Sequence, residues 1–186
     1  MSEVPRMLVP ERSLLLVIDI QERFVPVIPG YEQLVERAGI LVQACNRLEV
    51  PVIVSEQYPK GLGHTVPELR QVLAADTAVM EKTAFGCGGD PAILGQIFDL
   101  GRKQIMVCGI EAHVCVNQTV HQLLSEGYQV HLMRDAIASR NPDDAGTALA
   151  KMTQSGAIPG CVEMALFEMM TTARHPGFKE LQALVK

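Results

Sequence analysis

SLLLVID, residues 13–19, places five consecutive large aliphatic side chains before an aspartate. A strand with one face in water would alternate polar and apolar residues. This one does not, so both of its faces are expected to be covered. Similar runs recur between amphipathic segments: PVIVSE (51–56), AVMEK (78–82), QIMVCG (104–109), YQVHLM (128–133) and GCVEMA (160–165). Buried strands alternating with helices predict a three-layer α/β/α sandwich with a six-stranded, mostly parallel, Rossmann-like sheet.

Two of the amphipathic segments show clear helical spacing. Apolar residues recur at intervals of three and four from Tyr31 to Leu48, and again over residues 145–152. Before the second segment, Asn141 can cap the helix and Pro142 fits its first position. No repeat, linker or low-complexity segment divides the chain, so residues 1–186 are predicted to form a single domain.

Composition and charge exclude several classes of protein. Hydrophobic residues make up 48% and charged residues 20%, as in ordinary globular proteins. The net charge is −5 and no basic stripe occurs, so we expect no nucleic-acid partner. No apolar run approaches the ~18–20 residues of a membrane span, and the first residues lack the apolar core of a signal peptide. Five cysteines without a CxxC pair favour free thiols in a cytoplasmic protein without membrane contact.

Ligands of open parallel sheets bind beyond the carboxyl ends of the strands, so polar residues at those ends are the candidates for a site. Asp19 ends the first run and Lys82 ends the third. Cys115 follows the fourth run, where a buried strand is expected to give way to a helix. The remaining candidates at these ends are Gln21, Glu56, Asp135 and Ser139; the last two, with Arg140, either line a pocket or cap a helix.

Each of the three main candidates also has an ordinary structural interpretation. Asp19 could close a turn, Lys82 could lie in water, and Cys115 could be a small core residue. Together they form a nucleophile-activation set, because the acid can take the thiol proton while the lysine and the helix start favour a thiolate. The other cysteines are interpreted separately: Cys45 and Cys108 as packing residues, Cys161 as strand interior, and Cys87 as undecided.

Three motifs, VIDIQERF (17–24), EKTAFG (81–86) and VCGIEAHVCV (107–116), together resemble the isochorismatase-like family of cysteine hydrolases, which includes nicotinamidases and other amidases. The resemblance runs over residues 12–180, and the sequence looks closest to short isochorismatase-domain proteins. It implies a catalytic triad of Asp19, Lys82 and Cys115. It also implies a cis peptide bond between Ile110 and Glu111, with the Glu111 and Cys115 N–H groups forming an oxyanion hole.

The activity that the resemblance implies is hydrolysis of a C–N bond in a small molecule through a thioester on Cys115. Three alternatives stay open: vinyl-ether hydrolysis of the isochorismatase type, a thiol redox function in which Cys87 or Cys108 resolves an oxidised Cys115, and an interaction module that retains the fold. His113, two residues before Cys115, raises the further possibility of a Cys–His dyad.

Nicotinamidases of this family carry a metal site on an Asp-x-His pattern after the second strand. The equivalent stretch here, residues 55–65, keeps Glu56 and His64 but has Tyr58 where a histidine is expected. One carboxylate and one distant imidazole make a poor metal site, so we predict neither metal nor cofactor. The expected substrate pocket comprises Gln21, Phe24, Glu56, Tyr58 and His64. Family members generally associate, so a homo-oligomer is also expected.

Overall fold

The computed structural model describes residues 6–186, so the first five residues of the predicted domain lie outside the described part. Its sheet has six strands in the order β3-β2-β1-β4-β5-β6. The strands are β1 (Ser13–Ile18), β2 (Val52–Gln57), β3 (Ala78–Lys82), β4 (Gln104–Gly109), β5 (Gln129–Ile137) and β6 (Ile158–Gly160). Every neighbouring pair is parallel. The predicted α/β fold is confirmed, and the sheet is wholly parallel.

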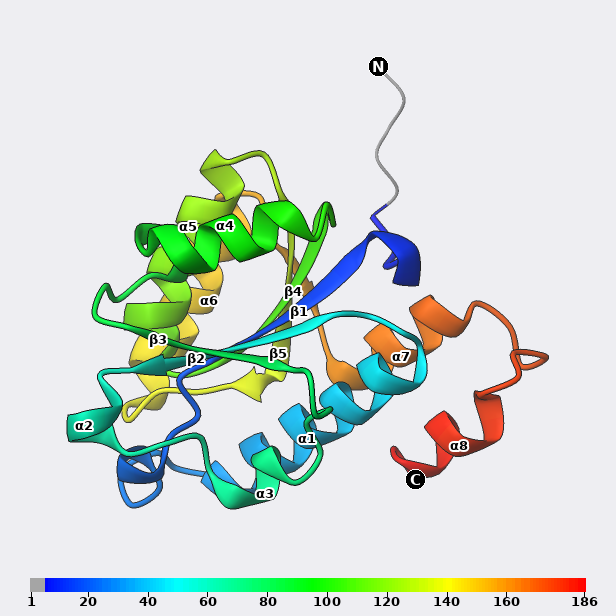
Figure 1. The fold of residues 1–186 in the computed structure, drawn as a ribbon, viewed down its shortest axis with the longest axis horizontal. Coiled ribbons are helices and arrows are strands. Elements are labelled where there is room, and N and C mark those ends of the chain that lie inside the picture. The colour runs from blue at the N-terminus through cyan, green and yellow to red at the C-terminus, as the bar shows by residue number, and fades with distance from the viewer. Residues whose placement is uncertain (1–5) are drawn as a thin grey trace.

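Helices cover both faces of this sheet, which gives the predicted three layers (Figure 1). They are α1 (Tyr31–Arg47), α2 (Pro59–Leu62), α3 (Pro67–Arg70), α4 (Pro91–Asp99), α5 (Asn117–Ser125), α6 (Pro142–Gln154), α7 (Val162–Met170) and α8 (Phe178–Ala183). Helices α4, α5 and α6 lie on one side, and α1, α3, α7 and α8 lie on the other. Within residues 6–186, none of the helices has the length and apolar character needed to cross a bilayer.

Strand β1 lies in the middle of the sheet and contributes to both hydrophobic cores. Leu14, Leu16 and Ile18 belong to the cluster beneath α4, α5 and α6. Leu15 and Val17 belong to the cluster beneath α1 and α7. Each such side chain contributes about 1.5–3 kcal/mol when it is fully buried. The unbroken aliphatic run of residues 13–18 is therefore explained by two covered faces.

The two helices predicted from spacing are confirmed. In α1 the apolar positions between Tyr31 and Cys45 that define the predicted face are buried. Helix α6 begins at Pro142, and the Asn141 side chain accepts a hydrogen bond from the Asp143 N–H at 3.0 Å. Local capping chemistry therefore sets this helix start, as the sequence indicated.

The prediction of a strand over residues 160–165 is wrong. Strand β6 ends at Gly160, and Cys161 is the N-cap residue of α7, not strand interior. The buried apolar residues that follow have helical spacing: Val162, Ala165, Leu166 and Met169. An apolar run this short does not distinguish a strand from a buried helix. The Asp135 carboxylate, on β5, accepts the Val162 N–H at 2.9 Å and so caps this helix.

Gly109 allows β4 to approach β1 closely at Ile18, the residue before Asp19. Its φ is +126°, in the region that favours glycine, and it is paired with Ile18 in the sheet. A Cβ at this position would lie 2.0 Å from the Ile18 carbonyl oxygen. Only glycine therefore permits these two strand ends to meet.

We predict that Gly109→Ala lowers the free energy of unfolding by about 3 kcal/mol or more, because it adds both a backbone clash and an unfavourable φ. The matched control is Gly146→Ala in α6, where a Cβ would meet nothing within 4 Å. The control should be neutral or more stable by up to about 1 kcal/mol. Urea unfolding followed by circular dichroism measures both, and equal stability of Gly109→Ala and wild type would contradict this packing.

Candidate active site

Asp19 follows the last residue of β1 and turns its side chain inward. Its φ is +53°, and its N–H donates to the Ser55 carbonyl at 3.1 Å, so the turn is held against β2. The carboxylate is fully buried. Its Oδ1 accepts a hydrogen bond from the Ser55 hydroxyl at 2.7 Å, and its Oδ2 accepts one from Lys82 Nζ at 2.7 Å. An acid at the end of a central strand is thus held between two donors.

Lys82 is the last residue of β3, and its ammonium group is also fully buried. Besides Asp19, it donates to Gln57 Oε1 at 2.7 Å and to the Phe85 carbonyl at 2.9 Å. An ammonium group has three N–H donors. All three have acceptors within the protein, so Lys82 can act on a substrate through its charge but has no free donor.

Cys115 lies in a single π-helical turn, Ala112–Val116, between β4 and α5. The residue is buried, with 7% of its surface exposed. Its thiol lies close enough to the Asp19 carboxyl group for each of the two groups to shift the pKa of the other. The ends of β1, β3 and β4 therefore bring together the three side chains that the sequence singled out.

Burial governs the ionisation of the acid and the thiol. Burial raises the pKa of Asp19, while the charge of Lys82, the hydrogen bonds from Lys82 and Ser55, and the nearby Cys115 thiol oppose this rise. Burial also raises the pKa of Cys115 to about 12, with the negative charge of Asp19 adding to the effect and Lys82 opposing it. This direction is opposite to the expected stabilisation of a thiolate. Cys115 is therefore a neutral thiol near pH 7, and its proton lies beside the carboxylate that can accept it.

The peptide bond between Ile110 and Glu111 is cis, at the position that the family resemblance implied. The Glu111 N–H has no hydrogen-bond acceptor within residues 6–186. The next N–H, that of Ala112, donates to the Ala138 carbonyl at 2.8 Å. The Glu111 carboxylate accepts a hydrogen bond from Arg140 Nε at 2.8 Å, so the Glu111 side chain is held against the segment after β5. A backbone donor is therefore left unpaired four residues before the thiol.

Ser55 and Gln57 also support the site, and neither was predicted from the sequence. They lie two residues apart on β2, so they face the same side of the sheet. Two polar residues with this spacing at the end of a buried strand were the available signal. Gln57 exchanges hydrogen bonds with Gln21: its N–H donates to Gln21 Oε1 at 2.8 Å, and Gln21 Nε2 donates to its carbonyl at 3.1 Å. Gln21, expected in the substrate pocket, thus braces this strand end.

Glu56 lies between Ser55 and Gln57 in β2, and its side chain points to the opposite face of the sheet. Its Oε1 accepts the Thr65 N–H at 2.7 Å, and its Oε2 is 2.9 Å from His64 Nδ1. Burial alone would raise the pKa of Glu56, but the hydrogen bonds from Thr65 and His64 outweigh it and hold the pKa below its ordinary value. Both carboxylate oxygens are therefore engaged in closing the loop after β2.

The other residues expected in the pocket lie on neighbouring loops: Tyr58 is exposed and Phe24 is half-buried. His113 is bonded through Nδ1 to the Ser139 hydroxyl at 2.9 Å, which gives it a partner other than Cys115. In the described part of the chain, no three His, Cys, Asp or Glu side chains gather as a metal site would require. The absence of a metal and of a cofactor stays a prediction.

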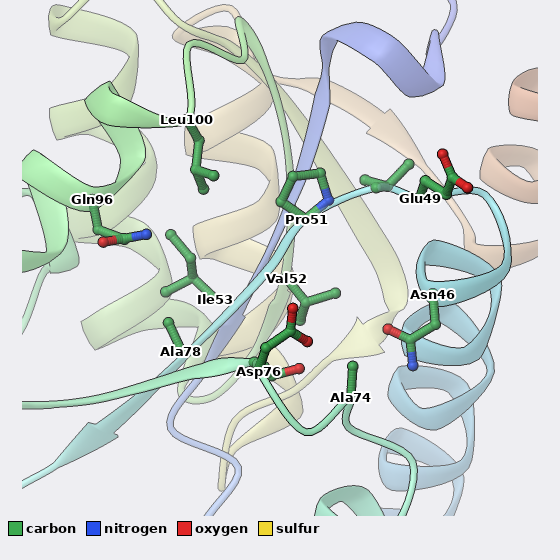
Figure 2. Close-up of a pocket in the computed structure, with 12 residues that line it drawn as sticks. Asn46, Glu49, Pro51, Val52, Ile53, Ala74, Asp76, Ala78, Gln96 and Leu100 are labelled. Carbon is green, nitrogen blue, oxygen red and sulfur yellow. The ribbon is translucent and has the colours of Figure 1, made fainter.

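A separate surface cavity of about 420 Å³ lies at the other end of the sheet (Figure 2). It is lined by the beginnings of β2 and β3, the end of α1, and α4, and its residues include Asn46, Pro51, Ala78, Gln96 and Leu100. None of the candidate catalytic side chains lines it. The chemistry is therefore assigned to the carboxyl ends of the strands, away from this cavity.

A parallel α/β/α sandwich with an acid, a lysine and a thiol gathered at its strand ends defines an α/β domain with a polar site at the carboxyl edge of its sheet. Comparison with known proteins identifies the family: the Isochorismatase domain matches residues 13–164, and the chain belongs to the isochorismatase family. At the level of the family, this supports a hydrolase that does not depend on a metal.

Individual relatives agree with this assignment. Isochorismatase domain-containing protein 2 of Danio rerio is 40% identical over 174 residues, which cover 93% of this chain and 86% of that protein. The solved structure of the MAR1 ribonuclease from Caenorhabditis elegans is 38% identical, with a TM-score of 0.92 and coverage of 96% of this chain and 92% of that chain. The YcaC gene product of Escherichia coli, described as an octameric hydrolase of unknown specificity, has a TM-score of 0.90 at 19% identity, covering 98% and 92% of the two chains, and shares the fold.

We predict that Lys82→Met lowers the free energy of unfolding by about 3–5 kcal/mol near pH 8, because it leaves the buried Asp19 charge without a partner. The folded-state pKa of Asp19 then lies further above its unfolded value, so stability is lost as the pH rises through the folded pKa. The deficit should therefore be smaller near pH 5 than near pH 8.

Two further variants make this test specific. Asp19→Asn combined with Lys82→Met should recover much of the lost stability, because no unpaired charge remains. Lys179→Met removes an exposed lysine and should stay within about 0.5 kcal/mol of wild type. Denaturant unfolding at both pH values measures all of these, and a deficit that grows toward acid pH would contradict the assigned ion pair.

Proposed function

We propose that the chain is a metal-independent cysteine hydrolase that cleaves a C–N bond of a small amide-type substrate. Cys115 would be the nucleophile, Asp19 the proton carrier and Lys82 their electrostatic partner. The observation that carries the proposal is one cluster of buried groups, in which Lys82 donates to Asp19 Oδ2 at 2.7 Å and the Cys115 thiol lies near enough for both charges to act on its pKa.

In the first half of the proposed reaction, Asp19 takes the thiol proton as the sulfur attacks the carbonyl carbon. A C–S bond forms and the carbonyl oxygen becomes an oxyanion. The unpaired Glu111 N–H, together with the Cys115 N–H, is the proposed donor set for that oxyanion. Asp19 then gives its proton to the nitrogen, the C–N bond breaks, and a thioester remains on Cys115.

In the second half, water attacks the thioester and Asp19 takes a proton from that water. The C–S bond breaks, the carboxylic acid leaves, and the proton returns to Cys115. Lys82 keeps its charge throughout. When Asp19 is neutral, this charge faces the sulfur or the oxyanion without competition from the carboxylate. The negative charge therefore moves within a site whose total charge stays constant, which limits the cost of carrying out the reaction in a buried place.

Amide-type hydrolysis is favoured over the alternatives by the thiol itself, because vinyl-ether hydrolysis of the isochorismatase type does not use one. The name of the Caenorhabditis elegans relative suggests a ribonuclease as a competing proposal. Cleavage of RNA would place a phosphodiester near cations that can donate to it. Here the Lys82 ammonium is fully buried with three protein acceptors, and the chain carries a net charge of −5. A small neutral amide fits these properties better.

We predict that a library of small primary amides contains substrates from which the protein releases ammonia. Cys115→Ala should lower the rate by about 10³-fold or more, and Asp19→Asn should lower it severely. Rapid quenching followed by peptide mass spectrometry should find the acyl group on Cys115.

Cys161→Ala is the matched control, because Cys161 is a free and partly exposed thiol outside the site. It should leave the rate unchanged. Ammonia release that survives Cys115→Ala, or hydrolysis of RNA in place of amides, would contradict the proposal. The redox alternative predicts a Cys115–Cys87 disulfide after peroxide treatment, since these two thiols share a core cluster and Cys108 lies in the other.

We also propose that the chain forms a homo-oligomer, as the description of the octameric Escherichia coli protein suggests for this fold. Several large apolar side chains are exposed on the described surface, among them Val79, Phe85 and Phe98. Light scattering coupled to size exclusion should therefore give a mass that is a multiple of 20.3 kDa. A monomer at micromolar concentration would contradict the proposal.

A further inference from the structure

The carboxyl end of β2 presents two buried polar side chains to the Asp19–Lys82 pair, one to each partner. The Ser55 hydroxyl donates to Asp19 Oδ1 at 2.7 Å, and Gln57 Oε1 accepts from Lys82 Nζ at 2.7 Å. Both residues are buried, with exposed fractions of 0% and 9%. The family resemblance assigned no role to either. Because Ser55 and Gln57 lie two residues apart on β2, one rigid strand holds both Asp19 and Lys82.

The Ser55 hydroxyl has a single proton, and this proton is committed to Asp19. The donated hydrogen bond favours the charged form of the carboxylate, since only that form accepts on all of its lone pairs. Lys82 occupies the other oxygen. With both oxygens held, the carboxylate cannot rotate freely, and the two hydrogen bonds oppose the protonation that burial favours.

Gln57 holds Lys82 in one orientation because its own amide group is fixed. Its Nε2 donates to the Thr83 carbonyl at 3.0 Å, which directs Oε1 toward Lys82. Its backbone is bonded in both directions to the Gln21 side chain, and Gln21 Nε2 also donates to the Gly63 carbonyl at 2.6 Å. The Gln21–Gln57 pair thus links the loop after β2 to Lys82. The hydrogen bond from Lys82 to Gln57 uses one ammonium N–H that could otherwise contact a substrate.

We propose that Ser55 and Gln57 are positioning residues for the reaction: Ser55 keeps Asp19 charged and aimed at Cys115, and Gln57 keeps Lys82 aimed at Asp19. The proposal rests on the proposed cysteine chemistry and specifies how it is set up. It assigns Lys82 an electrostatic role alone. It also makes β2, which supplies none of the three reacting groups, the element that controls the pH range in which the site works.

The test uses iodoacetamide as the probe, so no substrate is needed. The second-order rate of Cys115 alkylation is followed from about pH 4 to pH 9 by peptide mass spectrometry on the full-length protein. In wild type the rate should fall on the acid side as Asp19 becomes protonated and can no longer accept the thiol proton. In Ser55→Ala this acid limb should move upward by about 1–2 pH units, the effect of losing one hydrogen bond to a charged group. Ser55→Thr retains the hydroxyl and should restore the wild-type profile.

Gln57→Met removes the acceptor at nearly constant volume and should move the acid limb in the same direction, because the charge that faces Asp19 is held less well. Combining it with Ser55→Ala should shift the limb further than either change alone. The matched controls are Ser13→Ala and Gln104→Met, which make the same changes at a buried serine and a buried glutamine at the opposite end of the sheet. These controls report general loss of stability and should leave the pH profile unchanged.

The outcomes separate this inference from the proposed function. If wild-type Cys115 shows no acid limb at all, Asp19 is not its proton acceptor, and the proposed cysteine chemistry falls. If the limb is present but stays in place in folded Ser55→Ala or in folded Gln57→Met, the chemistry stands and the positioning role is overturned. If the controls shift the limb as much as the site variants do, the role of these residues is structural only and the proposal is also overturned.

Discussion

The buried ion pair between Asp19 and Lys82 is the interaction on which the rest of the site depends. Removing two charges from water costs several kcal/mol for each ion, and the attraction between them offsets this only when the remaining hydrogen-bonding groups are also satisfied. The protein meets this requirement with Ser55, Gln57 and the Phe85 carbonyl, so every Lys82 donor has an acceptor. These partners come from β2 and from the loop after β3, while Asp19 follows β1 and Lys82 ends β3, so the site forms only when these three strands are paired.

This pair also modifies the state of the thiol, which burial mainly sets. Burial raises the pKa of Cys115 to about 12, the negative charge of Asp19 adds to this rise, and the charge of Lys82, which is bonded to Asp19, opposes it. A neutral thiol beside an acid becomes nucleophilic when that acid accepts its proton, so the site needs no standing thiolate. The proton can move directly from the thiol to the neighbouring Asp19 carboxylate. The free protein therefore holds Cys115 as a neutral thiol, and one proton transfer to Asp19 forms the nucleophilic thiolate.

Much of the fold and the main polar residues could be predicted from the sequence, because they follow from local rules. Unbroken aliphatic runs such as residues 13–18 specify strands covered on both faces, and the ends of such strands locate Asp19, Lys82 and Cys115. What could not be predicted depends on tertiary contacts. The roles of Ser55 and Gln57 arise from their partners across the sheet, and the raised pKa of Cys115 arises from the depth of its burial. The run at residues 160–165 was misassigned because Asp135, which is on the neighbouring strand β5 but 27 residues earlier in the sequence, caps a helix there.

The most direct test of this account is the ionisation state of Cys115 in the free protein. Ultraviolet thiolate absorbance of wild type minus Cys115→Ser, titrated with pH, reports that state without a substrate or a chemical label. The account predicts no thiolate signal from Cys115 near neutral pH, with the signal appearing only in the alkaline range. A thiolate signal that is present near neutral pH and disappears in Lys82→Met would contradict it, because Lys82 would then be the partner of Cys115 and not of Asp19.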